Sequence, residues 1–373
     1  MQLPAIVDRE DLKGVRVLLR SSLNVPLEGG VVQSEFRIRR ALPTLKYLRK
    51  AGARVVLVGH IGREPEESLR PVFDALKKHI EVSWSDASVG EEAKQVVDKM
   101  EDGDIVMLEN LRRYPEEVAN DVGFSKTLAS LADMYVNDAF SVSHRRHASI
   151  VGVPNYLPGY AGITFVEEYT ALTKAMTPES PSLFILGGSK FETKLPLIER
   201  YADIYSEVFV GGALANDLFK ARGLSVGKSV VSDIDLSGQS IVVNERVLLP
   251  IDVTVTNGEL RRVTVPEDVH DDEYIYDAGP KTIEMLRARM QDAKTILWNG
   301  PLGYYEHGFA EYTKQCAEEV ARSSAHSIVG GGDTVAAIEL LGLQAEFDFI
   351  STAGGAMLVF LETGTLPGIE ALQ

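Results

Sequence analysis

The chain of 373 residues is longer than one hydrophobic core usually serves, and 45% apolar and 25% charged residues are typical of soluble globular protein, so we expect two ordered domains. A net charge of −16 disfavours nucleic acid or an anionic membrane as a partner, and any anionic ligand therefore needs a local basic pocket. The lack of a leader pattern, the lack of an apolar run of roughly 18 residues and the single cysteine, Cys316, lead us to expect a cytoplasmic protein without disulfides.

The first half of the chain alternates short apolar runs with segments of helical periodicity. The runs are rich in Val, Ile and Leu, which favours strands. Because the runs are continuously apolar, they indicate a parallel sheet covered on both faces. The predicted strands are Val15–Leu19, Val55–Val58, Ile105–Leu108 and Tyr135–Val136.

The second half repeats this alternation, with helices predicted over Thr282–Gln291 and Phe309–Arg322. All the strands together would make an unusually wide open sheet, so two sheets are expected. The sequence therefore predicts an α/β protein with two Rossmann-like domains joined by a hinge helix. The predicted strands of this half are Leu183–Leu186, Val208–Val210, Thr295–Trp298, Ser327–Val329 and Phe347–Ile350.

The predicted break between the domains lies near Gly159 to Pro178, where an amphipathic helix over about Phe165–Met176 is bounded by Gly and Pro. We expect domains at 1–159 and 178–356, an interdomain helix at 160–177 and a tail at 357–373. Between Asp233 and His270 the pattern changes to short strand-like pieces with turns.

Glycines follow four predicted strands of the second domain, where parallel sheets bind ligands. They are Gly187-Gly188, Gly211-Gly212, Gly300 after Asn299, and Gly330-Gly331-Gly332. Any one pair can be a tight turn without a ligand. Together at strand ends they favour a phosphate site, because backbone N–H groups and helix N-termini bind anions.

The glycine triplet is followed by Asp333 and Thr334 and then by the predicted helix Val335–Leu341. Asp333 can cap this helix, or it can hold a Mg²⁺ ion that bridges nucleotide phosphates. The sequence leaves both interpretations open.

Lys190 and Lys194 follow Gly187-Gly188 and lie one helical turn apart. They are either a solvated pair or two ammonium groups that bind a shared anion. The segment lacks the spacing of a Walker A loop, and no Gly-x-Gly-x-x-Gly turn follows the first strand, which weakens a dehydrogenase interpretation.

The first domain gathers basic side chains near its strand ends. Guanidinium groups bind carboxylate and phosphate in a bidentate manner, so the group suits a small, highly anionic substrate, although each Arg alone could lie on the surface. His144 and His147 could also form a metal pair, but no Cys is nearby. The basic residues are Arg20, Arg37, His60, Arg63, Arg112 and His144-Arg145-Arg146-His147.

The chain resembles phosphoglycerate kinase collinearly over almost its whole length. The segments that carry the resemblance are Leu19 to Pro26, Gly59-His60-Ile61-Gly62-Arg63, Leu108-Glu109-Asn110-Leu111-Arg112, Tyr135 to Phe140, His144 to Ser149, Leu186 to Lys190, Trp298-Asn299-Gly300-Pro301, Gly330 to Thr334 and Leu366-Pro367-Gly368.

This resemblance implies a first domain that binds 3-phosphoglycerate or its acyl phosphate, a second that binds MgATP or MgADP, a cleft that closes, and a tail that returns to the first domain. We also expect a monomer. The implied substrate-site residues are Ser22, Asn24, Arg37, His60, Arg63, Arg112 and Arg145. The implied nucleotide-site residues are Gly188, Lys190, Lys194, Gly212, Asn299, Gly300, Pro301, Glu306 at the ribose, Gly330, Gly331, Gly332, Asp333 as the Mg²⁺ ligand, and Thr334.

By the same resemblance, Arg37, Lys190, Mg²⁺ and the amides of Gly331 and Gly332 neutralise the charge of a loose phosphoryl-transfer transition state. The chain departs from the family where Ser22 replaces an Asp and where Ser141-Val142-Ser143 replaces Gly-Thr-Ala. Three hypotheses follow: an active phosphoglycerate kinase, a paralogous kinase for another phosphorylated acid, and a noncatalytic binding protein with the kinase fold.

Overall fold

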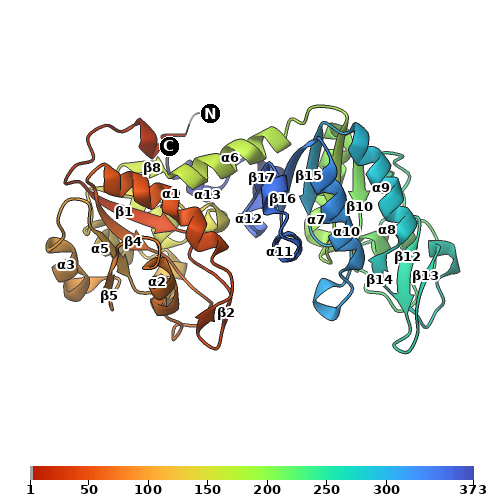
Figure 1. Ribbon diagram of the computed structural model, residues 1–373, viewed down its shortest axis with the longest axis horizontal. Coiled ribbons are helices and arrows are strands. Elements are labelled where there is room, and N and C mark those ends of the chain that lie inside the picture. Colours follow the sequence, from red (N-terminus) through yellow and green to blue (C-terminus); the bar gives the residue numbers. More distant parts are fainter. Residues whose placement is uncertain (1–2) are drawn as a thin grey trace. The chain divides into compact units, whose positions relative to one another are not determined.

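The computed structural model describes residues 3–373, which fold into two compact units (Figure 1). Unit 1 comprises the described residues up to Thr170 together with Thr363–Gln373, and unit 2 comprises Ala171–Glu362. Residues 1 and 2, which belong to the segment expected to lack a leader pattern, lie outside the described part. Among residues 3–373, no helix is both long enough and apolar enough to cross a bilayer.

Unit 1 is built on a parallel sheet in the order β5-β6-β4-β1-β7-β8. The strands at its centre are wholly or almost wholly buried, as their continuously apolar sequences predict. The strands are β1 (Arg16–Ser21), β4 (Arg54–Val58), β5 (Ser83–Ser85), β6 (Ile105–Leu108), β7 (Met134–Asp138) and β8 (Gly159–Ala161).

Successive side chains of these strands point to opposite faces, and both faces are covered. On one face Val17, Val55 and Leu57 pack in one cluster with Leu45 of α1 and Val72 of α2. The helices of unit 1 are α1 (Phe36–Lys50), α2 (Arg70–Leu76), α3 (Gly90–Asp98), α4 (Pro115–Ala119), α5 (Val122–Ala129), α13 (Pro367–Glu370) and the part of α6 (Ile163–Ala175) up to Thr170.

The last residues of the chain belong to unit 1. The backbone N–H of Gly368 donates to the carbonyl of Ser143, 2.8 Å away, in the loop that follows β7. A short antiparallel hairpin, β2 (Leu27–Glu28) and β3 (Val31–Val32), follows β1. The hairpin therefore follows the carboxyl end of β1 in sequence, and the loop after β7 lies beside that end.

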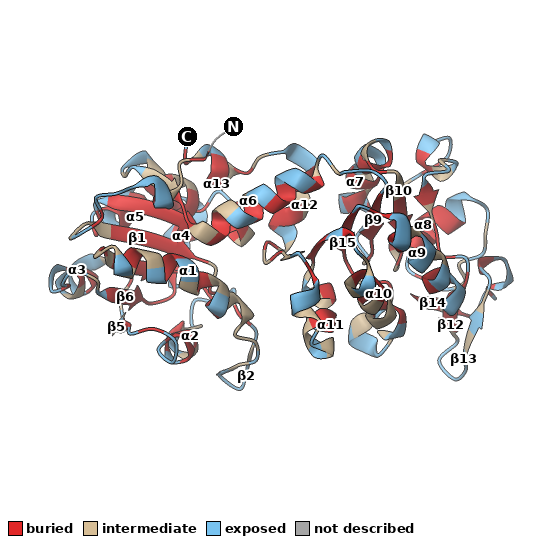
Figure 2. Ribbon diagram, turned by 45° about the horizontal axis from the view of Figure 1, so that its top comes forward, coloured by how far each residue is buried: buried red, intermediate tan, exposed pale blue. Residues whose placement is uncertain are grey.

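Unit 2 contains a second parallel sheet, in the order β11-β10-β9-β15-β16-β17. Figure 2 shows its central strands almost entirely in the colour of buried residues, with exposed positions on the outer sides of the helices. The strands are β9 (Ser182–Leu186), β10 (Glu207–Val210), β11 (Val247–Leu248), β15 (Thr295–Asn299), β16 (His326–Gly330) and β17 (Phe349–Ile350).

Helices cover both faces of this sheet as well. Ile296 and Trp298 pack with Leu286 of α9 and Cys316 of α10, while Phe184 on the opposite face meets the ring of Tyr201 of α7 at 5.3 Å. The helices are α7 (Phe191–Ile204), α8 (Leu214–Ala221), α9 (Pro280–Asp292), α10 (Glu311–Arg322), α11 (Gly332–Leu341) and α12 (Gly355–Thr363), with α6 ending in this unit.

The segment between Asp233 and His270, where the sequence pattern was weakest, contributes to a separate antiparallel sheet in the order β13-β12-β14. Its strands are β12 (Val253–Thr256), β13 (Arg261–Thr264) and β14 (Tyr274–Ala278). This sheet adds to the two parallel sheets that the sequence predicts. It matters for function because β14 forms part of a cavity wall.

A matched pair of substitutions tests the core of unit 1. Val55 is 0% exposed in β4 and Val31 is 63% exposed in β3. Val55→Ala removes buried methyl groups and leaves a cavity, so we expect it to lower the free energy of unfolding by about 2 kcal/mol, against less than about 0.5 kcal/mol for Val31→Ala. Urea denaturation followed by the fluorescence of Trp84, in β5 of the same unit, measures both. Equal effects would contradict the packing described above.

Candidate functional site

The basic residues predicted in the first domain meet at the carboxyl edge of the unit 1 sheet. Arg20 is the penultimate residue of β1, His60 and Arg63 follow β4, Arg112 follows β6 and Arg145 follows β7. These strands are neighbours in the order β6-β4-β1-β7, so their carboxyl ends lie side by side. The structure thus brings together residues that are up to 125 positions apart, from Arg20 to Arg145.

Arg20 and His60 form a buried pair at the centre of this edge. The Arg20 Nη2 atom lies 2.8 Å from His60 Nδ1, and Arg20 Nη1 donates to the carbonyl of Ser21 at 2.6 Å. Arg20 is completely buried and His60 nearly so. Arg20 was predicted only as one of several basic residues, and its burial could not be inferred from the sequence.

Hydrogen bonds hold the loops that carry the other residues predicted for a substrate site. Asn24 Oδ1 accepts from the N–H of Gly62 at 3.0 Å, and the Asn24 carbonyl accepts from Arg37 Nη1 at 3.0 Å. Arg112 Nη1 donates to the carbonyl of Gly62. Asn24 therefore links the chain after β1 to the loop after β4, and Arg63 in that loop remains exposed.

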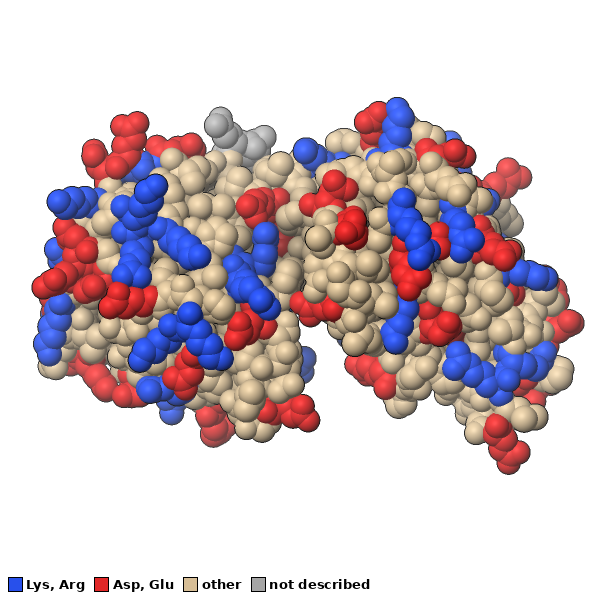
Figure 3. Space-filling model, in the orientation of Figure 1, with Lys and Arg blue, Asp and Glu red and all other residues tan. Residues whose placement is uncertain are grey.

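The positive charges at this edge lie close enough to repel one another. Burial, together with the charges of Arg20, Arg112 and Arg145, holds the pKa of His60 well below its usual value. The same causes lower the pKa of His147 to about 4. On the face shown in Figure 3, by contrast, basic and acidic side chains are interspersed. An edge where cations are crowded in an acidic protein is suited to an anionic ligand.

Ser22, which the sequence singles out as a departure, has a partner that was not predicted. Its hydroxyl lies 2.7 Å from the hydroxyl of Ser141, in the loop after β7. Ser141 belongs to the other departing segment, Ser141 to Ser143. Two differences from the family pattern, 119 residues apart, are thus in direct contact.

In unit 2 the predicted glycines form interlocked turns after β9, β10, β15 and β16. The N–H of Gly187 donates to the carbonyl of Asn299 at 2.8 Å, and the N–H of Gly188 donates to the carbonyl of Pro301 at 3.0 Å. Gly300 has φ +95°, and a Cβ there would meet the carbonyl oxygen of Gly187. Only glycine allows these backbones to approach so closely.

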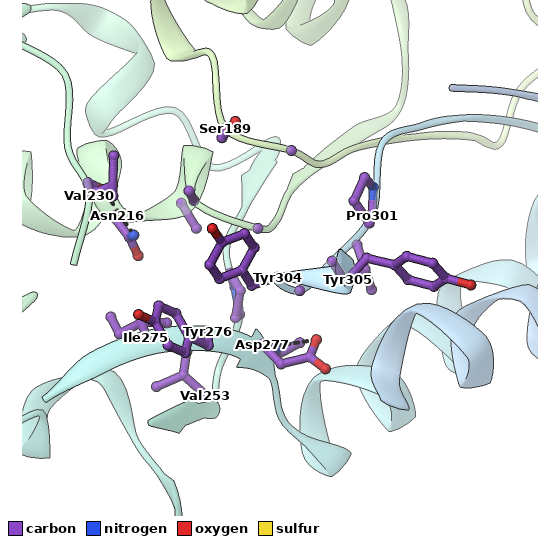
Figure 4. Close-up of a pocket in the computed structure, with 18 of the residues that line it drawn as sticks. Ser189, Asn216, Val230, Val253, Ile275, Tyr276, Asp277, Pro301, Tyr304 and Tyr305 are labelled. Atoms are coloured by element: carbon purple, nitrogen blue, oxygen red, sulfur yellow. Dashed lines mark hydrogen bonds between the residues drawn. The ribbon is translucent and has the colours of Figure 1, made fainter. Parts of the chain in front are cut away.

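A cavity of about 520 Å³ lies beside these turns (Figure 4). Figure 4 shows Asn216 and Val230 on one side of the cavity and Pro301 and Tyr305 on the other, with Tyr304 between them. The predicted nucleotide residues that line it are Gly188, Gly212, Pro301, Glu306 and Asp333. Glycine turns and carboxylates thus share a cavity with aromatic and apolar side chains.

Other predicted residues support the turns instead of lining the cavity. Asn299 is buried with its amide directed at the sulfur of Met357, 3.6 Å away. The hydroxyl of Thr334 accepts from the N–H of Gly300 at 3.1 Å. Gly331 is the N-cap of α11 and Gly332 is its first residue, so Asp333 lies in the first helical turn and is not the cap. Gly330 ends β16 against Met357.

Lys190 and Lys194 differ in environment. Lys190 is exposed at the start of α7, whereas Lys194 is buried and its Nζ donates to the carbonyl of Gly187 at 2.5 Å. Burial lowers the pKa of Lys194 to about 8, which the charge of Asp333 opposes. Lys194 therefore lies against the first glycine turn, whereas the side chain of Lys190 is exposed.

The sequence did not reveal the aromatic part of the cavity wall. Tyr276 of β14 packs edge-on against Tyr304, with ring centroids 5.3 Å apart, and against Phe309 at 4.9 Å. Asp277, the next residue in β14, also lines the cavity, and burial raises its pKa to about 7. Tyr274 and Tyr276, two residues apart in a strand, were the available signal of an aromatic surface, because alternate residues of a strand share a face.

Asp333 is the residue predicted to bind a metal ion. Among residues 3–373, no cluster of three or more His, Cys, Asp or Glu side chains could hold a metal ion by itself. His144 and His147 therefore belong to no such cluster. Burial and the neighbouring Glu306 raise the pKa of Asp333, and both carboxylates line the cavity. Mg²⁺ is commonly bound by one or two carboxylates plus substrate phosphates, so the predicted ligand Asp333 fits a nucleotide-bound cation.

Comparison with known proteins agrees with this geometry. The phosphoglycerate kinase family model matches residues 7–364. The phosphoglycerate kinase of Dictyoglomus turgidum is 44% identical over 98% of this chain and 97% of its own, and that of Rhodopseudomonas palustris is 40% identical over 98% of both. The phosphoglycerate kinase structure from Coxiella burnetii has a TM-score of 0.86 at 36% identity, covering 100% of this chain and 99% of its own. The chain belongs to the phosphoglycerate kinase family.

Proposed function

We propose that the chain catalyses reversible phosphoryl transfer from 1,3-bisphosphoglycerate to ADP, giving 3-phosphoglycerate and ATP, with the acid bound by unit 1 and the nucleotide by unit 2. As a member of its family the chain is a glycolytic kinase, a phosphotransferase with a carboxyl group as acceptor. The observation that carries the assignment of sites is the contrast between the two edges. Crowded cations mark the sheet edge of unit 1, and glycine turns beside an apolar cavity mark unit 2.

On the acid side, the cations at the unit 1 edge would bind the carboxylate and phosphate of the substrate. Exposed Arg63 and Arg145 can reach a ligand with their guanidinium groups, and His60 adds a neutral hydrogen-bond donor. Arg37, whose pKa is lowered by burial, would act on the transferring phosphoryl group. Guanidinium forks suit such oxygens because they bind in a bidentate manner.

On the nucleotide side, the cavity would hold the base among Phe219, Val230 and Ile275, and the phosphates beside Gly188 and Asp333. The N–H groups of Gly331 and Gly332 are at the start of α11, where the helix dipole favours anions. Lys190 and Lys194 would add positive charge. The transition state spreads negative charge over the equatorial oxygens, and these groups neutralise it.

We assign the Mg²⁺ ion of the nucleotide to Asp333, with Glu306 on the same wall. When bound, the ion would offset phosphate charge. The proposed transfer needs no covalent nucleophile, and Cys316 is unsuited to that role because it is fully buried and burial raises the pKa of its thiol. We also infer a cytoplasmic monomer.

The alternative hypotheses gain no support. A paralogous kinase or a noncatalytic binding protein was suggested by Ser22 and Ser141, yet the basic edge keeps Arg37, His60, Arg63, Arg112 and Arg145. The relatives that match across the chain are phosphoglycerate kinases by name.

The assignment predicts which charges matter for turnover. Arg37→Ala and Asp333→Asn should each lower kcat by about 10²–10³, because each removes one group that stabilises transition-state charge. Arg39→Ala, an exposed arginine on the same helix as Arg37, is the matched control and should leave kcat within about twofold. A coupled assay of ATP consumption with 3-phosphoglycerate measures all three. Absence of ATP consumption by the unaltered chain would overturn the proposal.

The pKa of Lys194 predicts a pH dependence for the nucleotide. Because its pKa is about 8, Lys194 is charged below that pH and loses its charge above it. We therefore expect kcat/KM for ADP to fall as the pH rises through 8. Lys194→Gln should abolish that decline. Asp277, whose pKa is about 7, titrates at lower pH, so Asp277→Asn should leave the decline near pH 8 in place and remove only a change near pH 7. A decline near pH 8 that persists in Lys194→Gln would assign it to another group.

The contact between Ser22 and Ser141 predicts coupled substitutions. The family places Asp and Gly at these positions, and the two extra atoms of Asp would need the space that the Ser141 side chain fills. Ser22→Asp with Ser141→Gly should lower KM for 3-phosphoglycerate about tenfold, and Ser22→Asp alone should lower it less. KM for ATP serves as the internal control. If the single variant matched the double variant, the two side chains would not share a space.

A further inference from the structure

A chain of buried polar contacts runs behind the basic edge of unit 1. Glu117 Oε1 accepts from the hydroxyl of Ser149 at 2.6 Å, and Glu117 Oε2 accepts from the N–H of Ser149 at 2.9 Å. The Ser149 hydroxyl in turn accepts from Arg20 Nε at 2.9 Å, and Arg20 contacts His60. Glu117 is 1% exposed and Ser149 is 0% exposed. The contacts join α4, the π-helical segment η4 (Ala148–Gly152), β1 and the loop after β4.

The chemistry of each group fixes the direction of every bond in this chain. A guanidinium only donates, so His60 Nδ1 must accept from Arg20 and cannot carry a proton. The proton of neutral His60 is therefore on Nε2. Likewise, the Ser149 hydroxyl accepts from Arg20, so its single proton goes to Glu117. The carboxylate of Glu117, three contacts away through Ser149 and Arg20, is thus linked to the tautomer of His60.

The surroundings of His60 leave its ring neutral. Burial disfavours a charged ring, and Arg20, Arg112 and Arg145 place positive charge near it, which acts in the same direction. His60 therefore contributes no charge to an anion, but only an N–H donor. A neutral imidazole that could exchange tautomers would present that donor for only part of the time. A fixed tautomer presents it permanently, which is the property that a preorganised site requires.

A purely structural role for the carboxylate explains less. A buried ion pair is weak evidence for added stability, because desolvation offsets the attraction. Glu117 also does not touch Arg20 directly: the Ser149 hydroxyl stands between them, and His147 Nδ1 lies 3.8 Å from Glu117 Oε1. The arrangement orients donors toward the basic edge.

We propose that Glu117 and Ser149 are positioning residues that orient Arg20 and thereby hold His60 as the Nε2–H tautomer, a fixed donor to the anionic acid substrate. The tautomer follows from the contacts alone, whereas its use in substrate binding rests on the proposed function. Neither Glu117 nor Ser149 was among the residues predicted for the site.

The test combines nuclear magnetic resonance with kinetics. Long-range ¹H–¹⁵N correlation spectra show which ring nitrogen carries the proton, and the signals of His60 are assigned by their loss in His60→Asn. In the unaltered chain we expect a proton on Nε2 only. In Ser149→Ala, Arg20 loses its acceptor, and we expect mixed tautomers and a rise of about tenfold in KM for 3-phosphoglycerate. KM for ATP should not change, and kcat should stay within about twofold.

Matched variants separate positioning from general damage to the core. Ser125→Ala removes another buried hydroxyl of unit 1, one that bonds only the carbonyl of Asp121, and should leave the tautomer and KM unchanged. Ser149→Thr retains the hydroxyl and should restore both readouts. Glu117→Gln, which keeps the shape but not the charge, should reproduce Ser149→Ala.

Two outcomes would overturn the proposal. One is a proton on Nδ1 of His60 in the unaltered chain, and the other is a Ser149→Ala variant that matches Ser125→Ala in both spectra and KM. The spectra require no turnover, so a chain that failed to act on 3-phosphoglycerate would refute the proposed function while the tautomer could still be read.

Discussion

Mutual repulsion among positive side chains at the carboxyl edge of one sheet is the constraint on which the arrangement of the unit 1 edge depends. Parallel strands all end at the same edge, so basic residues that follow different strands are forced together. The structure separates their roles by burial. Arg20 is enclosed and compensated by Glu117 through Ser149, whereas Arg63 and Arg145 remain exposed. An anion that binds there relieves repulsion that the folded chain has already accommodated.

The sequence predicted the fold class well because its strands are buried on both faces. Continuous apolar runs such as Ile105–Leu108 leave little choice of structure, and the observed strand has the same bounds. The antiparallel sheet was harder to predict, since strands such as β13 alternate exposed and half-buried residues and are short. Helix starts were also displaced: α11 begins at Gly332, where glycine propensity gave no helical signal.

The sequence indicates which residue types lie near the strand ends, but not the contacts that those residues make with distant parts of the chain. Glycines at strand ends and arginines near them were found because their chemistry is local. The amide of Asn299, by contrast, points at Met357, and the hydroxyl of Thr334 holds a turn, which only the packed structure reveals. The contacts of Ser22 with Ser141 and of Glu117 with Ser149 join distant parts of the chain, and a single sequence carries no sign of such pairs.

The closing residues of the chain have a consequence for synthesis. Unit 1 combines the described residues up to Thr170 with Thr363–Gln373, and Gly368 bonds the loop that carries Ser143. During translation that loop lacks its partner until the ribosome has made the whole of unit 2. Unit 2 is continuous in sequence and can be complete first, although domains generally fold in order from the amino terminus. The nascent protein therefore cannot form this contact, and so cannot complete unit 1, until Gly368 has been made.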